Sequence, residues 1–403
     1  MEKQLKPQLR FPEFSVNWEI KSIKNIAKVI GGGTPSTTNN DYWNGDINWF
    51  TPTEIKFDIV SESKRKITDL GLSKSSATLL PKGTILLTTR ATIGEVAIAQ
   101  KECTTNQGFQ SLVVNKSNSN QFVFDLIKVY RKQLYKRANG STFKEVSKKE
   151  IEKIEVLIPS LPEQQKIASF LSDVDDKITK LTKKKDLLEQ YKKGIMQKIF
   201  NQELRFKDEI TNKNYPDWEE KKLSDITKYY DGTHQTPNYV PKGVPFYSVE
   251  HVTANQFVKT KFISEEVFEK ENKRVKLENG DILMTRIGNI GKAKYIDWDV
   301  RASFYVSLAL IKQNSSFSSK YLSQYINAIF FQRELWKRTI HVAFPQKINL
   351  GEIGNCLVKL PSIEEQHKIA DFLGDIDLKI DTLKIKIEKA QAFKKGLLQK
   401  MFV

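Results

Sequence analysis

Two stretches of the sequence, residues 159–203 and 361–403, carry apolar side chains at alternating steps of four and three residues. In the first stretch these positions are Ile167, Leu171, Val174, Ile178, Leu181, Leu188, Ile195 and Ile199. In the second they are Ile369, Leu373, Ile376, Ile380, Leu383, Ile387, Ala390, Leu397 and Met401. This spacing predicts two long helices that pack on each other as a coiled coil, with lysines interrupting the seam at Lys185, Lys192 and Lys394.

The two helical stretches are copies of one sequence. They align without a gap at an offset of 202 residues, and half of the aligned positions are identical. A serine and a glutamate stand at capping-box spacing in both copies, as Ser160 with Glu163 and as Ser362 with Glu365. We therefore expect each carboxylate to reach back to the backbone amide of its cap residue. Each copy also carries a glycine inside the expected helix, Gly194 or Gly396, which costs up to about 1 kcal/mol and indicates a close helix crossing or a local break.

The regions in front of the helices repeat more faintly. Leu9-Arg10-Phe11 recurs as Leu204-Arg205-Phe206, and Phe11-Pro12-Glu13-Phe14 resembles Tyr215-Pro216-Asp217-Trp218. Gly83-Thr84-Ile85-Leu86, followed by Thr88 and Arg90, resembles Gly280-Asp281-Ile282-Leu283, followed by Thr285 and Arg286. The chain is therefore predicted to consist of two tandem units, roughly 1–200 and 201–403, each a variable domain followed by a well-kept helix.

The variable domains contain short β-branched or alternating runs separated by turn residues. Strands are expected at residues 84–88, 94–99 and 303–310, and helices at 121–136 and 319–337. The expected fold class is α+β, with two tandem mixed α/β domains joined by two long helices in a pseudo-twofold arrangement. The domain boundaries predicted from these patterns are 1–158, 159–203, 204–360 and 361–403.

Charge and composition point to a polyanionic partner. The chain has 403 residues, 65 lysines and arginines against 48 aspartates and glutamates, and a formal net charge of +17. Its 39% of hydrophobic residues indicates a folded protein rather than a disordered polycation. The sequence contains two cysteines and no apolar run long enough to span a bilayer, so we expect a cytoplasmic protein without a membrane partner.

Polar loops of the variable domains hold the side chains best suited to phosphates and base edges. Arginine, lysine, asparagine, glutamine and threonine make most such contacts. The candidate DNA-binding residues are Thr34, Ser36, Thr89, Arg90, Asn139, Ser141 and Lys144 in the first unit, and Thr233, His234, Gln235, Thr285, Arg286, Asn289, His341, Gln346 and Lys347 in the second. Each could instead be a solvated surface group, and Arg90 or Arg286 could form an internal ion pair.

Signatures of catalysis are weak. There is no Gly-x-x-x-x-Gly-Lys-Ser/Thr phosphate loop, and the four histidines lack ligand spacing. Asp46, Glu54 and Lys56 superficially resemble the trio of a metal-dependent nuclease, although the second unit has no obvious equivalent. The triple glycine at residues 31–33 is expected to be a flexible turn, because only one glycine stands in the corresponding slot. A reader of nucleic acid is favoured, with a single-chain nuclease or methyltransferase, an RNA-binding protein and a purely structural coiled coil as alternatives.

The helix-opening sequence, present twice, resembles a known family. Ile158-Pro159-Ser160-Leu161-Pro162-Glu163-Gln164 and Leu360-Pro361-Ser362-Ile363-Glu364-Glu365-Gln366, each followed by Lys-Ile-Ala-x-Phe-Leu, are similar to the specificity subunits of type I restriction–modification systems. The second copy has Glu364 where proline is usual, and a carboxylate also suits a helix N-terminus.

The resemblance implies that each variable domain is a target-recognition domain for one half of a bipartite DNA site. It implies two helices packed antiparallel as a ruler for the unspecified gap, and no catalytic residue in this chain. Two modification subunits would bind S-adenosylmethionine and methylate adenine at N6, and restriction subunits would use ATP and magnesium for translocation and cleavage. Phage DNA-mimic inhibitors are a further possible partner. The spacer and partner-docking residues would be Glu163, Gln164, Ile167, Leu171, Ile178, Glu365, Gln366, Ile369, Leu373 and Ile380.

Overall fold

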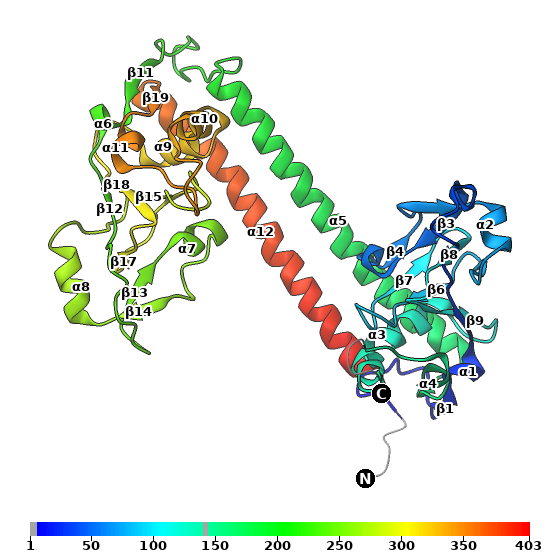
Figure 1. Cartoon of the computed structure of the whole chain (residues 1–403). Coiled ribbons are helices and arrows are strands. Elements are labelled where there is room, and N and C mark those ends of the chain that lie inside the picture. Colours follow the sequence, from blue (N-terminus) through cyan, green and yellow to red (C-terminus); the bar gives the residue numbers. More distant parts are fainter. Residues whose placement is uncertain (1–5, 140–143) are drawn as a thin grey trace. The chain divides into compact units, whose positions relative to one another are not determined.

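In this computed structural model, which describes residues 6–139 and 144–403, the chain divides into two units (Figure 1). The first comprises Met1–Leu181 and Lys386–Val403, and the second comprises Thr182–Ile385. Each unit holds one variable region and part of both long helices, α5 (Leu161–Phe200) and α12 (Ile363–Met401). The expected fold class, two tandem mixed α/β domains with two long helices, is confirmed. The linear domain boundaries stay a prediction.

The first variable region contains a five-stranded sheet in the order β2-β9-β6-β7-β4, a three-stranded sheet β5-β3-β8 and the pair β1-β10. Its strands are β1 (Glu19–Ser22), β2 (Ala27–Gly31), β3 (Trp43–Phe50), β4 (Ile59–Val60), β5 (Arg65–Ile67), β6 (Ile85–Leu87), β7 (Val96–Ala99), β8 (Cys103–Thr105), β9 (Gln110–Val114) and β10 (Glu155–Ile158). Its helices are α1 (Ile23–Ile26), α2 (Asp69–Ser73), α3 (Asn120–Lys136) and α4 (Lys148–Glu152), with the 3-10 turns η1 (Asn40–Tyr42) and η2 (Pro52–Glu54).

The second variable region repeats this plan with a four-stranded sheet β12-β18-β15-β16, a three-stranded sheet β14-β13-β17 and the pair β11-β19. Its strands are β11 (Glu219–Lys222), β12 (Tyr229–Asp231), β13 (Val244–Tyr247), β14 (Lys261–Ile263), β15 (Ile282–Thr285), β16 (Ala293–Tyr295), β17 (Ser303–Phe304), β18 (Leu308–Ile311) and β19 (Leu357–Leu360). Its helices are α6 (Leu223–Ile226), α7 (Val249–Ala254), α8 (Glu265–Asn272), α9 (Ser319–Ile326), α10 (Ile329–Arg338) and α11 (Leu350–Gly354).

Two expected elements of the second unit are interrupted. The helix expected at 319–337 is two helices, α9 and α10, separated by Asn327 and Ala328, of which Ala328 is extended. At this break the Asn327 side chain binds the backbone of Ala293 in both directions, with N–O distances of 3.1 and 2.9 Å. The strand expected at 303–310 is likewise β17 and β18, separated by Tyr305–Ser307. The expectations at 84–88, 94–99 and 121–136 correspond to β6, β7 and α3.

In each unit the two long helices run in opposite directions. In the second unit, Lys192 on α5 binds Asp377 on α12, whereas Trp218 contacts both Phe200 and Glu365, at the end of one helix and the start of the other. In the first unit, Lys394 binds Asp175, and Phe402 stacks on Phe122 at a centroid distance of 5.2 Å. The seam residues Ile167 and Leu171 share one buried cluster with Leu397 and Met401. Ile369, Leu373 and Ile380 share another with Ile199 and Phe200. Ile178 is half-buried.

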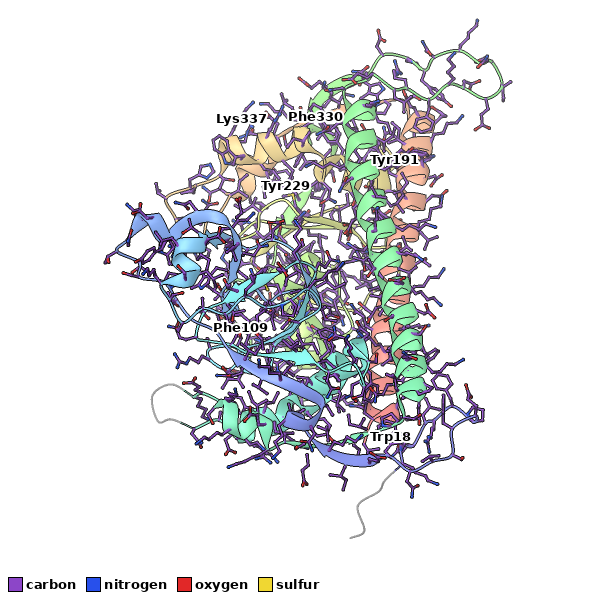
Figure 2. All side chains as sticks on the ribbon, turned by 90° about the vertical axis from the view of Figure 1, so that its right-hand side faces the viewer. Trp18, Phe109, Tyr191, Tyr229, Phe330 and Lys337 are labelled. Atoms are coloured by element: carbon purple, nitrogen blue, oxygen red, sulfur yellow. The ribbon has the colours of Figure 1, made fainter. Side chains whose placement is uncertain are left out.

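A buried glutamate fixes the start of each long helix. Glu163 accepts hydrogen bonds from Arg10 at 2.7 Å and from the Trp18 indole at 3.1 Å (Trp18 is labelled in Figure 2). Glu365 accepts the equivalent bonds from Arg205 and Trp218. The expected reach of these carboxylates back to the cap amide is therefore wrong. Charge-assisted bonds to an arginine are stronger than a bond to one amide, so the carboxylate faces the variable region instead.

These contacts also correct one alignment. Trp18, rather than Phe14, holds the place that Trp218 has in the second unit, because both indoles donate to the equivalent glutamate. The following glutamine is buried in both copies and ties the helix to the N-terminus of α3 or α9. Gln164 accepts from the Ser119 amide at 2.9 Å, and Gln366 accepts from the Ser318 amide at 2.8 Å. The helix-opening motif thus joins each long helix to its own variable region.

The described residues contain neither a helix that could cross a membrane nor a group of three or more histidine, cysteine, aspartate or glutamate side chains arranged to hold a metal ion.

Candidate DNA interface

Three loops proposed from the sequence meet at one end of the first unit's large sheet. The loop after β2 is joined to the β8–β9 loop, since the Gly33 amide donates to Thr105 and the Thr34 hydroxyl donates to Gln107 at 2.5 Å. The loop after β6 is joined to the same place, since the Thr89 amide donates to the Gly108 carbonyl. Thr89 in turn accepts from the Val146 amide, which follows the third loop.

Exposed candidates of the first unit lie around this meeting point. Arg90 forms an ion pair with Glu145 at 2.8 Å, and Glu145 also pairs through its backbone with Asn139. The Lys144 ammonium lies 4.7 Å from the centroid of the Tyr135 ring, and the Ser36 hydroxyl bonds Thr38 at 2.8 Å. Arg90, Asn139, Lys144 and Ser36 are exposed, whereas Thr89 is buried and bonded to Gly108. Ser141 lies outside the described residues.

In the second unit one carboxylate binds basic groups from three different segments. Asp231 binds Arg274 at 2.8 Å, His234 at 2.8 Å and Arg286 at 3.3 Å. Burial raises the pKa of Asp231, and the hydrogen bonds from Arg274 and His234 outweigh it, so the pKa is lowered overall. Asp231 therefore stays ionised and organises three basic groups at the loop ends.

Arg286 forms an internal ion pair, which the sequence analysis left open as an alternative to DNA contact. It is 8% exposed, and its guanidinium also donates to the carbonyls of Ile348 and Val306. Burial lowers the pKa of Arg286, against the opposing effect of Asp231. The buried side chain therefore connects several loops. Its position indicates that it holds other side chains in place.

The remaining candidates of the second unit divide by exposure. His234, Gln235, Asn289, His341, Gln346 and Lys347 are exposed. Thr233 and Thr285 are buried, and the Thr285 hydroxyl bonds the Asn289 carbonyl inside its own turn. Gln346 contributes a backbone carbonyl to Gly288 at 2.8 Å, so the 288–291 turn is held against the third loop. Direct contact of any of these side chains with DNA stays a prediction.

The pairing of Arg90 with Arg286 is wrong by one residue. Thr88 and Thr285 are equivalent, since each binds the backbone of the turn that follows it. Thr89 therefore holds the place of Arg286, and the amides of both bind corresponding loops, at Gly108 and Ser307. Each arginine follows the equivalent strand of its own unit, β6 or β15, but the two side chains lie in different surroundings. Arg90 faces solvent with Glu145, and Arg286 points into the unit.

The loops that follow β2 and β12 share one glycine, and close packing of the backbone requires it. A Cβ on Gly32 would lie 2.0 Å from the Asn106 carbonyl oxygen, and one on Gly232 would lie 2.2 Å from the Phe304 carbonyl oxygen. Such contacts are impossible, so the backbone approach requires glycine at both positions. The expected flexible turn at residues 31–33 is instead a closely packed one.

Sequence reasoning missed Arg274 and an exposed apolar group in and next to the third loop of the second unit. Val342, Phe344 and Trp336 are 97%, 104% and 68% exposed. These apolar side chains, close in sequence to His341 and Gln346, are exposed and take no part in a buried core. The signal was present in the run His341-Val342-Ala343-Phe344, which is apolar although it lies in a loop.

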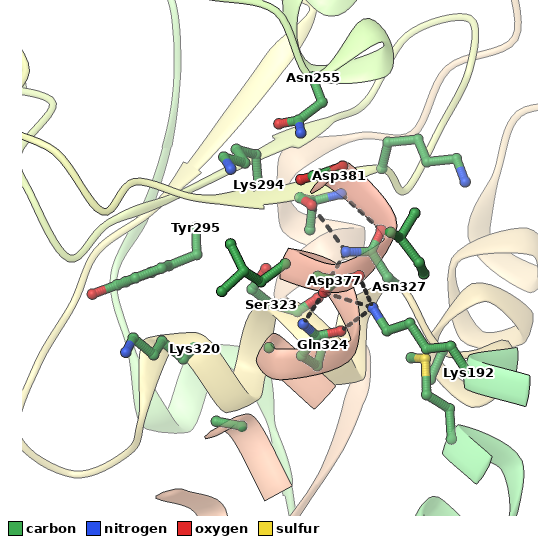
Figure 3. Close-up of a pocket in the computed structure, with 18 of the residues that line it drawn as sticks. Lys192, Asn255, Lys294, Tyr295, Lys320, Ser323, Gln324, Asn327, Asp377 and Asp381 are labelled. Carbon is green, nitrogen blue, oxygen red and sulfur yellow. Dashed lines mark hydrogen bonds and ion pairs between the residues drawn. The ribbon is translucent and has the colours of Figure 1, made fainter. Parts of the chain in front are cut away.

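Beyond the loops, the second unit has a pocket of about 840 Å³ between its long helices and α9, with many charged and amide side chains among the residues that line it (Figure 3). At its floor, Lys192 donates to both oxygens of Asp377, at 2.6 and 2.7 Å, and to Gln324 at 2.9 Å. Gln324 also donates to Asp377, which closes the network. Lys192 therefore provides an ion pair between the helices, and the equivalent pair in the first unit is Lys394 with Asp175. Lys185 instead pairs with Asp186 and Glu189 of its own helix.

We predict that Lys192 and Asp377 are energetically coupled. Lys192→Met and Asp377→Asn should each destabilise the second unit, and the double substitution should cost less than the two losses combined, with a coupling of about 1–2 kcal/mol. Urea unfolding of the four proteins of the cycle measures this coupling. Lys193→Met, next along the helix but exposed, is the matched control. Strictly additive losses at positions 192 and 377 would contradict the assignment.

The nuclease alternative needs Glu54 as a metal ligand, but the structure gives this carboxylate a structural role. Glu54 accepts hydrogen bonds from the Thr51 amide at 2.8 Å and from the Lys64 amide at 2.7 Å, so it caps η2 and secures a neighbouring turn. Asp46 is exposed on β3. Both cysteines are buried, and burial raises the pKa of Cys103 and of Cys356 to about 12, so neither is an activated nucleophile.

Comparison with known proteins agrees with this duplicated plan. The family model of the type I restriction modification DNA specificity domain matches the chain twice, over residues 15–190 and 215–392. The chain belongs to this family. The family is therefore represented once in each half, and each match contains one variable region and most of the helix that follows it.

Individual relatives support the same assignment. The MjaIX specificity subunit of Methanocaldococcus jannaschii is 33% identical over 287 residues, covering 68% of this chain and 66% of that protein, just under two thirds of its length. The MjaVIII specificity subunit of the same organism is 26% identical over 403 residues, covering 97% of this chain and 92% of that protein. The crystal structure of a type I system S subunit from M. genitalium covers 99% of both chains with a TM-score of 0.63 at 16% identity, which shows a shared fold.

Proposed function

We propose that this chain gives a type I restriction–modification complex its DNA sequence specificity, with each unit reading one half of an asymmetric bipartite site. The two long helices set the gap between the halves and dock two modification subunits. Those subunits supply S-adenosylmethionine-dependent adenine N6 methylation, and restriction subunits supply ATP- and magnesium-dependent cleavage. The chain itself is non-catalytic in this proposal and needs no cofactor of its own.

One observation carries the proposal. The two units share a framework in which three loops meet at one end of a sheet, yet the side chains at equivalent positions differ. Gly31 stands where the second unit has Asp231, and Thr89 stands where it has Arg286. Two different half-sites require different side chains on the same framework, because base edges are discriminated by their pattern of donors and acceptors. The net charge of +17 supplies attraction to phosphates that should weaken steeply with salt.

The test is methylome sequencing of cells that express the chain with an active type I modification subunit. We expect adenine methylation at one two-part motif that depends on this chain. Arg90→Ala should relax or abolish recognition of one half of the motif, and His234→Ala the other half, because each lies in the loop cluster of a different unit. Each lost base contact should reduce binding of the cognate duplex by about 1–3 kcal/mol, which is roughly five- to 150-fold.

Lys183→Ala, an exposed lysine on α5 outside the loops, is the control and should leave the motif unchanged. If a verified partner produced no methylation that depends on this chain, the assignment would be abandoned in favour of RNA binding. If each loop variant altered both halves equally, the division of one half per unit would be wrong.

A further inference from the structure

The third loop of the second unit, which joins α10 to α11, is held at its base by backbone hydrogen bonds. Ile340 forms a β-bridge with Lys347 across the loop, and the Ile340 amide donates to the Lys347 carbonyl at 2.8 Å. Lys347 also forms a bridge with Ile287, and the Ile348 amide donates to the Arg286 carbonyl at 3.0 Å. The base of the loop is therefore ordered before any partner binds, which removes part of the entropy cost of binding.

The tip of this loop exposes apolar side chains. Phe344 and Val342 are almost fully exposed, and neither belongs to a buried cluster. Beside the tip, the Trp336 ring lies 4.9 Å from that of His341, and the His341 Nε2 lies 2.9 Å from the Trp336 carbonyl oxygen. His341 is thereby fixed against the end of α10. Phe344 thus presents a whole aromatic ring to solvent from a loop that is anchored on both sides.

The segment that carries the tip is basic. Residues 335–351 contain two lysines and one arginine but no aspartate or glutamate, and Lys347 is exposed. The nearest acidic residues on either side, Glu334 and Glu352, both form ion pairs with Arg338. Because phosphates attract lysine and repel free carboxylates, the charge around Phe344 favours close approach to DNA.

A DNA duplex offers few surfaces that can cover a phenyl ring. The groove edges of the bases present hydrogen-bond donors and acceptors, and the thymine methyl group is the main apolar exception. The flat faces of the bases are larger, but a side chain reaches them only where two neighbouring base pairs are parted. Phenylalanine is one of the side chains that proteins insert in this way, and the insertion kinks the duplex. A ring that is exposed in the free protein is covered best by such an insertion.

We propose that Phe344 inserts between two adjacent base pairs of the half-site that the second unit reads, and that it kinks the duplex there. Val342 packs beside the parted step, and Lys347 binds a neighbouring phosphate. Pyrimidine–purine steps are the easiest to part, so the second half-site has a TA, CA or TG step at this point. Recognition of that step comes from the ease of parting it rather than from contacts with base edges. This inference rests on the proposed function, because it adds a mode of recognition for one half-site.

The experiment measures 2-aminopurine fluorescence in duplexes bound to the full chain with its modification subunit. The duplexes carry the motif found by methylome sequencing. 2-Aminopurine replaces in turn each adenine, on either strand, of the half that depends on His234. We expect fluorescence to rise severalfold at one step besides the target adenine, which the modification subunit extrudes. Phe344→Ser should abolish that second rise, keep the rise at the target adenine, and weaken binding of the duplex by about tenfold.

Two further variants separate insertion from a general effect of the substitution. Phe344→Leu retains an apolar side chain that can part a step, so it should keep most of the second rise and of the affinity. Ile210→Ser is the matched control, because Ile210 is a similarly exposed apolar residue of the same unit that follows two acidic residues. Its fluorescence and affinity should equal those of the parent. The free chain should melt at the same temperature in every variant, since neither side chain is buried.

A parent complex that binds the motif without a second rise would overturn the inference and leave the proposed function standing. So would unchanged fluorescence and affinity in Phe344→Ser. If replacing a thymine by uracil reproduced the loss of affinity, Phe344 would contact a methyl group in the groove and insertion would be wrong. Loss of the modification subunit from the Phe344→Ser complex would assign the ring to a protein partner and overturn the inference. A parent complex that prefers no duplex over another would instead refute the proposed function, and the inference with it.

Discussion

Glu365→Ala should destabilise the second unit by about 3–5 kcal/mol, which for a unit of this size lowers its melting temperature by roughly 10 °C. Glu365 is fully buried and accepts hydrogen bonds from Arg205 at 2.7 Å and from the Trp218 indole at 3.0 Å. Its hydrogen bonds raise the pKa of Arg205, whose guanidinium would remain charged and without its buried partner after the substitution. Differential scanning calorimetry with hydrogen-exchange mass spectrometry would measure the loss and locate it.

The expected loss of protection includes residues 205–222 and the first turns of α12, and it leaves the first unit unchanged. Glu163→Ala should produce the same effect there through Arg10 and Trp18. Glu364→Ala is the matched control, because Glu364 is adjacent and exposed. If the cause is an unpaired buried charge, Arg205→Met combined with Glu365→Leu should be less damaging than Glu365→Ala. A double variant as unstable as the single one would refute that cause.

Asp125→Asn should stabilise the first unit at pH 7.5 by about 2–3 kcal/mol and leave its stability nearly unchanged at pH 4. Asp125 is fully buried on α3, and its Oδ1 has no hydrogen-bond partner among the described residues. Burial is the main reason that its pKa is raised from 3.8 to about 6, against the opposing charges of Lys394 and Lys128. The equivalent residue of the second unit is the neutral Gln324, which binds Lys192 and Asp377.

The direction in which stability changes with pH follows from the number of protons that the folded and unfolded states bind. Between about pH 4 and pH 6 the folded unit holds a proton on Asp125 that the unfolded chain has lost, so stability falls as the pH rises through that window. The asparagine variant lacks this dependence. Urea unfolding of parent and variant across that range gives the difference, and exposed Asp173→Asn is the control, for which the difference should be flat. A constant difference for Asp125→Asn would contradict a raised pKa.

The long helices were predictable because their signal is local. A seam repeated every three to four residues fixes both the helical state and the buried face, and the structure confirms it at Ile167, Leu171 and Ile369. The role of Glu163 was not predictable in this way, because Arg10 and Trp18 lie about 150 residues away in the sequence. The only traces of that contact in the sequence were an arginine and a tryptophan that recur near the start of each unit.

The sequence predicted where the loops lie, but it predicted only some of the interactions that their side chains make. Sequence comparison located the segments that meet at the sheet ends, because glycine and proline mark turns. It placed Arg90 and Arg286 in one register, although Thr89 is the equivalent of Arg286 and Arg90 stands one position further into the loop that follows the strand. Asp231 was absent from the candidates, because its importance depends on three basic groups that only the folded loops bring together.

The stacking of Phe402 on Phe122 has a consequence for the order in which the chain folds as it is synthesised. The first unit's buried cluster includes Leu397, Met401 and Phe402, and the Leu9 amide donates to the Lys400 carbonyl. The second unit is one continuous segment, Thr182–Ile385. On the ribosome, the second unit can therefore finish folding first, although it is translated later. The first unit must wait, with part of its core exposed, until residues 386–403 emerge from the exit tunnel.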